Sequence, residues 1–292
     1  MIQKLEMLIA LAKERHFGRA AASLGITQPS LSAGIKQLEE QLGVKLVHRG
    51  SRFGGLTPEG QRALELAREI IRDTRRLQEE MRVSRKGLSG TVRLAVIPTA
   101  LTWASDLATR FNAAHPDVSF SIMSRSSTDI LKMIENLEAD AGISYLDNER
   151  GRMAAQPLYQ EHYTLVCHRS HPLATRKSVT WADLAGLKLC LLSPDMQNRQ
   201  IINRNFAECG LSPIAMIESN STVVLVSNVV SGDWVTILPV DLANFLAAGQ
   251  PLTTIPLTGG APAHGVGLLA AYQEPQTPLL SALFALTATL AD

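Results

Sequence analysis

The sequence predicts a multidomain α+β protein with a small helical N-terminal domain, a long connecting helix and a larger α/β domain. Three observations support this. Residues 1–58 show three short helical patterns followed by a hairpin pattern, the order typical of a winged helix-turn-helix domain. Residues 61–86 contain neither Gly nor Pro, which predicts one uninterrupted helix. From Thr91 onwards short β-rich runs alternate with helices, which indicates α/β layers.

The N-terminal domain has the periodicity of three packed helices. Apolar residues at helical spacing predict helices at about residues 3–14, 18–24 and 28–42. Gly25 and Gly43 end the second and third of these, because Gly readily takes the left-handed conformation just past a helix end. The second and third helices can therefore form a helix-turn-helix, which places the third in the major groove of DNA.

A hairpin wing and a long helix follow. Val44–Val47 predicts a short strand, residues 48–55 a turn, and Leu56 the start of a return strand. Thr57-Pro58-Glu59 is a strong helix start, so residues 59–90 are interpreted as a linker helix and hinge. Apolar and small side chains on this helix alternate in steps of four and three, as in a heptad seam. They are Ala63, Ala67, Ile70, Thr74, Leu77 and Met81.

Charge is unevenly spread along the chain. Residues 1–90 hold 16 Lys and Arg against 10 Asp and Glu, so they carry +6, whereas the remaining residues carry −5. Only the first third is therefore expected to meet a polyanion. There is no apolar stretch of about 18 residues and no secretory signal, so we expect a cytoplasmic protein without a membrane segment. The three cysteines, Cys167, Cys190 and Cys209, suit buried thiols in a reducing compartment and not a disulfide framework or a zinc site.

The third helix offers the groups that DNA reading needs. Its apolar face is expected to be buried, while polar side chains on the other face can bond base edges and phosphates. The wing arginines are placed to reach the adjacent backbone or minor groove. The alternative is an ordinary three-helix unit with a solvated polar face. The predicted DNA-binding residues are Thr27, Gln28, Pro29, Ser30, Ser32, Lys36, Arg49 and Arg52.

Five segments of the first 60 residues carry a family resemblance: His16–Ala21, Thr27–Ser32, Ile35–Glu39, Leu42–Leu46 and Leu56–Gly60. In this order they closely resemble the N-terminal domain of LysR-type transcriptional regulators, and the remainder fits that family in length and order of elements. Two positions depart from the family. Val47 stands where Phe is usual, and Gly34 inside the recognition helix costs roughly 1 kcal/mol relative to Ala if it is exposed.

The resemblance implies the rest of the architecture. Residues 91–292 would form a periplasmic-binding-protein-like regulatory domain, with lobe one at 91–160 and 269–292 and lobe two at 161–268. The chain would cross between the lobes near residues 160–163 and 267–270. The linker helix would pair antiparallel with that of a second copy, although packing on its own winged domain is the alternative. A homotetramer, as a dimer of dimers on pseudo-palindromic double-stranded DNA, is implied, with RNA polymerase as a further candidate partner.

Polar groups near helix N-termini follow several predicted strands of the regulatory domain and suit a small anion, such as a carboxylate, as effector. By resemblance, Thr99, Ser126 and Pro194–Gln197 fall where family members hold effectors. For each hydroxyl, the alternative role is to cap the N-terminus of a helix. Arg125 is a candidate for binding the anion, and its alternative role is a surface ion pair. The predicted effector-binding residues are Thr99, Ala100, Ser126, Ser144, Pro194, Met196, Gln197 and Asn220.

A narrower resemblance concerns Arg49–Phe53, Ile97–Ala100 and Glu135–Glu138, which look like LysR-type regulators associated with formate dehydrogenase operons. It implies a one-carbon or other small carboxylate signal.

Two other classes of protein are the alternatives to a ligand-sensing regulator. An enzyme is not expected, because no phosphate loop, nucleophile elbow or paired-carboxylate motif is present, and no cofactor is predicted. His162, His168 and His171 invite a metal site, but their spacing favours strand and turn histidines. An architectural DNA protein without a ligand is the second alternative, for which a 202-residue acidic α/β domain is excessive. Thermal shifts against a metabolite panel would separate it from a sensor.

Overall fold

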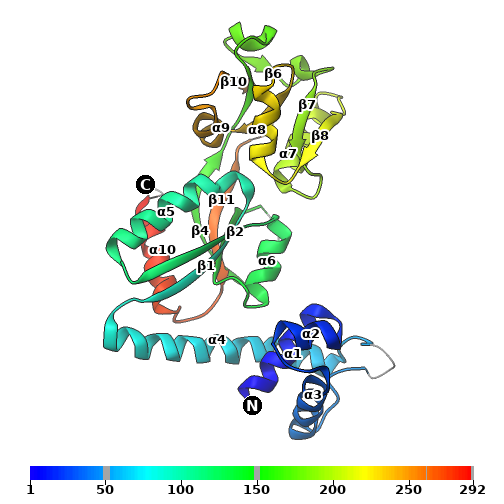
Figure 1. Cartoon of the computed structure of the whole chain (residues 1–292), viewed down its shortest axis with the longest axis vertical. Coiled ribbons are helices and arrows are strands. Elements are labelled where there is room, and N and C mark those ends of the chain that lie inside the picture. The colour runs from blue at the N-terminus through cyan, green and yellow to red at the C-terminus, as the bar shows by residue number, and fades with distance from the viewer. Residues whose placement is uncertain (49–52, 148–151, 261, 291–292) are drawn as a thin grey trace.

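The computed structural model describes residues 1–48, 53–147, 152–260 and 262–290 of the chain. Figure 1 shows the N-terminal helices at one end, a long helix that runs along the first α/β lobe, and a second lobe beyond it. The predicted architecture of a helix-turn-helix, a linker helix and two α/β lobes is confirmed.

The N-terminal domain consists of α1 (Ile2–Glu14), α2 (Phe17–Ser23) and α3 (Gln28–Leu42), close to the predicted ranges. His16 caps α2 by accepting hydrogen bonds from the N–H groups of the first turn. Gly43 ends α3 at φ +72°, a left-handed conformation that explains a glycine there.

Gly34 is buried at the contact between α3 and α1, so the cost expected for an exposed glycine does not apply. A Cβ at this position would lie 2.3 Å from Sδ of Met7. The missing side chain therefore lets the two helices approach closely.

The wing is shorter than predicted. Among the described residues its strands reduce to one bridge between Val47 and Leu56, extended by a hydrogen bond of 3.0 Å from the His48 N–H to the Gly55 carbonyl. The strand expected over residues 44–47 is therefore wrong in extent. A side chain of α3 replaces the missing ladder, because Oε1 of buried Glu39 accepts the Leu46 and Val47 N–H groups at 3.0 and 3.3 Å.

Helix α4 (Pro58–Lys86) starts at Thr57, whose hydroxyl accepts the Gly60 N–H at 2.9 Å. The alternative interpretation, packing on the winged domain, describes only the first part of the helix, and pairing with a second copy stays a prediction for the rest. Leu64, Ala67 and Ile71 are buried against the N-terminal domain. The seam residues Ile70, Leu77 and Met81 are 43%, 58% and 56% exposed, and so have no partner of their own within the described chain.

Lobe one is a five-stranded sheet with the order β2-β1-β3-β11-β4. Its strands are β1 (Gly90–Val96), β2 (Val118–Ser124), β3 (Ala141–Tyr145), β4 (Met153–Glu161) and β11 (His264–Ala271), and its helices are α5 (Leu101–Ala114), α6 (Ser127–Glu135) and α10 (Pro278–Leu290). A single-turn 3-10 helix, Pro98–Ala100, joins β1 to α5.

Lobe two is a six-stranded sheet with the order β6-β10-β5-β9-β7-β8. Its strands are β5 (Tyr163–His168), β6 (Val179–Thr180), β7 (Leu189–Leu192), β8 (Ala215–Ser219), β9 (Val235–Pro239) and β10 (Leu252–Thr258). Its helices are α7 (Gln197–Glu208), α8 (Thr222–Val230) and α9 (Val240–Ala247), together with the 3-10 turns Pro172–Thr175 and Ala182–Leu184.

The boundary between the lobes corrects one prediction. The first crossing lies at His162, between β4 and β5, within the predicted range. The second lies between Thr258 and His264, because all of β11 pairs with β3 and β4 of lobe one. The crossing expected at residues 267–270 is therefore wrong. The sequence pattern predicts a strand at Gly265–Tyr272, but periodicity carries no information about which sheet a strand joins.

A short loop of lobe one fixes the N-terminal domain in place. In this docking loop, residues 136–140, the Leu137 side chain enters the core of the N-terminal domain. Nζ of Lys13 on α1 lies 3.0 Å from Glu138, and Arg68 of α4 donates to Oδ1 of Asn136 at 2.6 Å. Arg75 of α4 donates to the Leu137 carbonyl at 3.1 Å. The sensor-side lobe and the helical domain thus form one packed unit.

Replacing Gly60 by Ala is expected to destabilise the protein. A Cβ there would lie 1.9 Å from the carbonyl oxygen of Leu46, and backbone cannot yield as a flexible side chain can. Overpacking of this kind costs about 1–3 kcal/mol, more than the gain in helix propensity. Chemical denaturation of Gly60→Ala should show this loss. Gln61→Ala, at the next, exposed position, is the control; equal stability of the two variants would contradict the prediction.

Candidate DNA-reading surface and ligand cleft

Six of the predicted DNA-binding residues lie on or beside the start of α3. Thr27, Gln28, Pro29, Ser30, Ser32 and Lys36 are all exposed, while Leu31, Ile35 and Leu38 on the opposite face are buried. The sequence therefore orients the helix as DNA reading requires. Arg49 and Arg52 of the wing lie outside the described residues.

Hydrogen bonding within α3 divides these residues by role. The Thr27 hydroxyl accepts the Ser30 N–H at 3.3 Å, and the two hydroxyls lie 2.9 Å apart. Thr27 and Ser30 thus stabilise the helix start. Lys36 lies 3.7 Å from Glu40, an exposed pair that contributes little and can open. Gln28 and Ser32 are exposed, so their amide and hydroxyl groups face solvent.

The wing is anchored to the helix-turn-helix by an aromatic contact. The rings of Phe17, on α2, and Phe53, in the wing, lie edge to face with centroids 6.2 Å apart. Such pairs contribute about 0.5–1.5 kcal/mol beyond their buried area. The wing base is therefore held against α2, beside the exposed face of α3.

Three predicted effector residues meet in a small cavity between the lobes. Thr99 lies above the end of β1, and Met196 and Gln197 lie at the start of α7 in lobe two. The cavity volume is about 10 Å³, which is the space of about one water molecule. The described lobes are thus closed on each other at this point.

Three polar residues of this cavity are absent from the predicted effector-binding set, although Ser127 and Tyr145 belong to the polar groups that follow predicted strands. Ser127 at the start of α6, Tyr145 at the end of β3 and Asn198 on α7 also line it. Neighbouring residues of a strand point to opposite faces, so Ser144 and Tyr145 could not both face the cleft, and the sequence did not say which does.

The other five predicted residues do not line the cavity. Ser126 caps α6, because its hydroxyl accepts the Asp129 N–H at 3.2 Å. Helix capping is the alternative role that the sequence left open for this hydroxyl. Ala100 and Ser144 are buried beside the cavity, whereas Pro194 and Asn220 are exposed. Arg125 donates to the Ser124 carbonyl at 2.7 Å.

Unsatisfied polar atoms gather around the cavity. The Thr99 and Ser127 hydroxyls and Oδ1 of Asn198 are buried, and none makes a hydrogen bond of acceptable geometry within the described structure. Each such atom costs about 1–3 kcal/mol if it stays unpaired. Because they come from both lobes, a polar ligand between the lobes would satisfy all three. Buried polar atoms of both lobes thus lack partners at the same place.

A buried carboxyl group lies where the chain crosses between the lobes. Glu161, at the end of β4, is 1% exposed. It accepts hydrogen bonds from the hydroxyls of Tyr145 and Tyr163, the latter at 2.9 Å. Asn198 of lobe two in turn lies 3.4 Å from the Tyr163 hydroxyl. Burial raises the pKa of Glu161, although the two tyrosines oppose the shift, so its neutral form is favoured.

The histidines considered for a metal site act in turns. Nδ1 of His168 accepts the Ser170 N–H at 3.1 Å, and Nδ1 of His171 accepts the Leu173 N–H at 3.2 Å. Within the described ranges, no group of three or more His, Cys, Asp or Glu is placed to hold a metal ion. No described helix is both long and apolar enough to cross a membrane.

A winged helix-turn-helix with an exposed polar reading face, packed on a two-lobed domain with a polar cleft, defines a class: DNA-binding regulators that carry a ligand-binding sensor. A family model described as "LysR substrate binding domain" matches residues 85–291. A second, "Bacterial regulatory helix-turn-helix protein, lysR family", matches residues 2–61. The chain belongs to the LysR family of transcriptional regulators, as the motifs of residues 16–60 predicted.

Relatives and solved structures agree with this assignment. YbhD of Escherichia coli K12, an uncharacterized HTH-type transcriptional regulator, is 32% identical over 208 residues, 71% of this chain and 66% of YbhD. The transcriptional dual regulator OxyR of the same organism is 29% identical over 281 residues, 96% and 91% of the two chains. These relatives are regulators, which confirms that the protein is not an enzyme.

Two full-length structures share the fold. An OxyR variant from Pseudomonas aeruginosa matches with a TM-score of 0.74 at 23% identity, covering 100% of this chain and 95% of that one. CbnR, a LysR family regulator solved with its target DNA, matches with a TM-score of 0.61 at 21% identity, covering 100% of each.

Replacing Glu161 by Gln should remove a pH dependence of stability. Because its folded-state pKa is raised, wild-type stability should fall as pH rises from about 4.5 up to that pKa, by about 1.4 kcal/mol per pH unit within the window. Glu161→Gln, neutral throughout, should lack this component. Denaturation at several pH values measures it, with exposed Glu208→Gln as control. Parallel wild-type and Glu161→Gln curves would mean that burial does not shift this carboxyl group.

Proposed function

We propose that the protein is a sequence-specific promoter-binding regulator that inserts α3 into the major groove. The observation that carries this is the shared exposed face of Gln28, Ser32 and Lys36, held by a capped helix start on a buried apolar face. Gln28 and Ser32 would bond base edges and Lys36 a phosphate, while Thr27, Pro29 and Ser30 shape the helix start. Arg49 and Arg52 complete the proposed set from the wing. Such a protein would work in the cytoplasm, where promoter DNA lies.

The effector is proposed to be a small anion, such as a carboxylate, in the cleft between the lobes. Helix α7 begins at the cavity without a side-chain cap, so the positive end of its dipole faces the ligand space. The Thr99 and Ser127 hydroxyls face it from lobe one. Burial raises the pKa of Glu161 nearby, which lessens the repulsion of an anion by this carboxyl group. Formate and other small carboxylates are therefore the first compounds to test.

Effector binding is proposed to reach DNA through α6. Its first residue, Ser127, lines the cleft, and the docking loop follows its last turn. The closed cavity holds about one water molecule, so a larger effector requires a wider lobe angle. An effector that prefers one angle shifts the population of that state, and the docking loop would carry the change to α1 and α4.

A homo-oligomer, and specifically a dimer of dimers, is proposed from two separate apolar faces. One is the exposed seam of α4, at Ile70, Leu77 and Met81. The other is the outer edge of lobe two, where Ile214 is 80% and Met216 65% exposed beside and on edge strand β8. Two distinct self-complementary faces give a tetramer with paired DNA readers, which suits a pseudo-palindromic site. RNA polymerase is proposed as a further partner only if the protein activates transcription.

A second candidate function comes from the names of relatives, several of which are hydrogen peroxide-inducible genes activators. The one from Dickeya chrysanthemi is 30% identical over 239 residues, 82% of this chain and 78% of that protein. Peroxide reacts with thiolates. Burial raises the pKa of Cys167 to about 11 and that of Cys190 to about 12, which disfavours both thiolates. Burial therefore argues against a thiol-based response at these two residues, and Cys209, predicted to be buried but exposed in the structure, is the cysteine on which this weaker proposal would depend.

Replacing Gln28 by Ala is expected to weaken specific DNA binding by roughly tenfold to a hundredfold, the cost of about 1–3 kcal/mol for a lost base contact. Non-specific binding should change little. Gel-shift titrations at fixed salt, on the promoter region adjoining the gene and on a scrambled duplex, measure both. Gln41→Ala, exposed in the last turn of α3, is the control. Equal loss on both duplexes would show that Gln28 touches only the backbone.

Replacing Thr99 by Val should abolish the effector response and leave DNA affinity intact, because the substitution removes only a hydroxyl from the cleft. The test compares gel shifts with and without formate and a panel of small carboxylates. Thr109→Val, on the exposed face of α5, should respond as the wild type does. An unchanged response of Thr99→Val to an active compound would place the effector elsewhere. A specific shift that no carboxylate alters would overturn the anionic effector and leave the DNA reader standing.

A further inference from the structure

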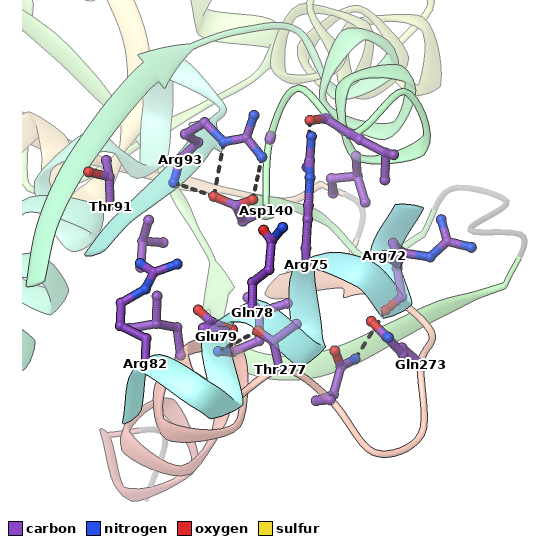
Figure 2. A pocket seen from close by; sticks show the side chains of 18 residues that line it. Arg72, Arg75, Gln78, Glu79, Arg82, Thr91, Arg93, Asp140, Gln273 and Thr277 are labelled. Atoms are coloured by element: carbon purple, nitrogen blue, oxygen red, sulfur yellow. Dashed lines mark hydrogen bonds and ion pairs between the residues drawn. The ribbon is translucent and has the colours of Figure 1, made fainter. Parts of the chain in front are cut away.

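A second cavity lies at the joint between the linker helix and lobe one, apart from the cleft. Its volume is about 210 Å³. One wall is a single face of α4 between residues 72 and 82; the others are the start of β1, the docking loop and residues 271–280. Figure 2 shows the side chains of α4 rising into this joint cavity from below.

The floor of the joint cavity is apolar. Val92 of β1, Ile134 of α6 and Leu279 and Leu280 of α10 line it, and all four are buried in the core of lobe one. Water in contact with such a floor is displaced favourably by an apolar group, at about 25 cal/mol per Å² of surface covered. The floor therefore suits the hydrocarbon part of a ligand.

The wall formed by α4 carries hydrogen-bond donors. Arg75 and Arg82 stand on either side of Gln78, whose amide points towards Asp140 (Figure 2). The two acidic groups here are already engaged. Asp140 forms a two-bond pair with Arg93, at 3.1 and 2.5 Å, and Glu79 is hydrogen-bonded to Thr277.

Arg75 and Arg82 have carboxylates nearby, Asp140 and Glu6 for Arg75 and Glu79 for Arg82, but none in ion-pair contact within the described residues. Among the described residues neither guanidinium forms an ion pair, and each donates only to a main-chain carbonyl, of Leu137 at 3.1 Å and of Ser89 at 3.2 Å. Burial, and then the positive charge of Arg93, lower the pKa of Arg75, so an additional anion would stabilise its charged form. The joint cavity thus combines an apolar floor with two incompletely paired cations.

We propose that the joint cavity binds a small organic anion with an apolar body, its carboxylate held by Arg75, Arg82 and Gln78 and its hydrocarbon part on the floor. Guanidinium groups suit this role because they bind carboxylates through charge-assisted, directional hydrogen bonds. The walls belong to both α4 and lobe one, so the ligand stabilises their contact. The site is independent of the cleft and supplies a second input to the docking loop.

The test uses hexanoate as the probe and hexanamide as its uncharged analogue, with the full-length protein. Hydrogen–deuterium exchange should show that hexanoate protects residues 72–82 and 271–280, and that hexanamide does so far more weakly. Protection confined to the cleft, around residues 97–99 and 192–198, would overturn the proposal. So would the absence of hexanoate binding at millimolar concentration, as expected if a second copy of the chain fills the cavity, or equal binding of the two compounds.

Variants identify the groups that hold the anion. Arg82→Gln should weaken hexanoate binding in calorimetry about tenfold, the loss of one charge-assisted hydrogen bond. Gln78→Glu is a second, exposed variant for the case that Arg82→Gln perturbs folding. Its added negative charge repels the carboxylate and should also weaken hexanoate binding about tenfold. Arg85→Gln, on α4 but outside the cavity, and Thr99→Val, in the cleft, should not change it. Unchanged affinity in both Arg82→Gln and Gln78→Glu would overturn the proposal, and loss only in Thr99→Val would assign hexanoate to the cleft.

Discussion

The docking of lobe one on the N-terminal domain is the constraint on which the arrangement of the chain depends. Leu137 sits at φ +62°, a left-handed conformation that costs a non-glycine residue about 1–2 kcal/mol. Burial of its side chain in the core of the neighbouring domain contributes about 2 kcal/mol in return. The bonds of Asn136 and Glu138 to α4 and α1 add to this balance. Without this loop, α4 alone would connect reader and sensor.

The two lobes are joined by polar chemistry as much as by the chain. Glu161 collects hydrogen bonds from a tyrosine of each lobe, and Asn198 extends this network to the start of α7. The lobes therefore meet around a buried carboxyl group. Beside it lies a cavity in which several buried polar atoms lack hydrogen-bond partners. In the proposed ligand cleft, opening of the lobes would break some of these bonds, and a ligand would replace them. The stability of the closed state and the proposed ligand affinity would then depend on the same atoms.

Periodicity and capping residues predicted most elements, because they act locally. Strand β4 was missed, since Pro157 interrupts its pattern; Pro is tolerated there because β4 is an edge strand. The crossing before β11 was misplaced because sheet membership is a long-range property. In the cleft, Thr99 and Gln197 were predicted from family resemblance, whereas Glu161 and Asn198 carried no local signal. Pairings of residues as distant as Lys13 and Glu138 cannot be read from one sequence.

The contacts of the docking loop set a limit on modularity. The reader and sensor look separable along the chain, with Gly87–Gly90 between them, yet Lys13 and Arg68 contact side chains that come more than sixty residues later. A chimera that joined residues 1–90 to the sensor of another regulator would lack these contacts, although each half could fold. Its N-terminal domain would then be connected to the lobes by α4 alone, and a change in the lobes would no longer be passed to it through the docking loop. If effector control runs through the docking loop as proposed, the unit to transplant is the N-terminal domain together with this loop.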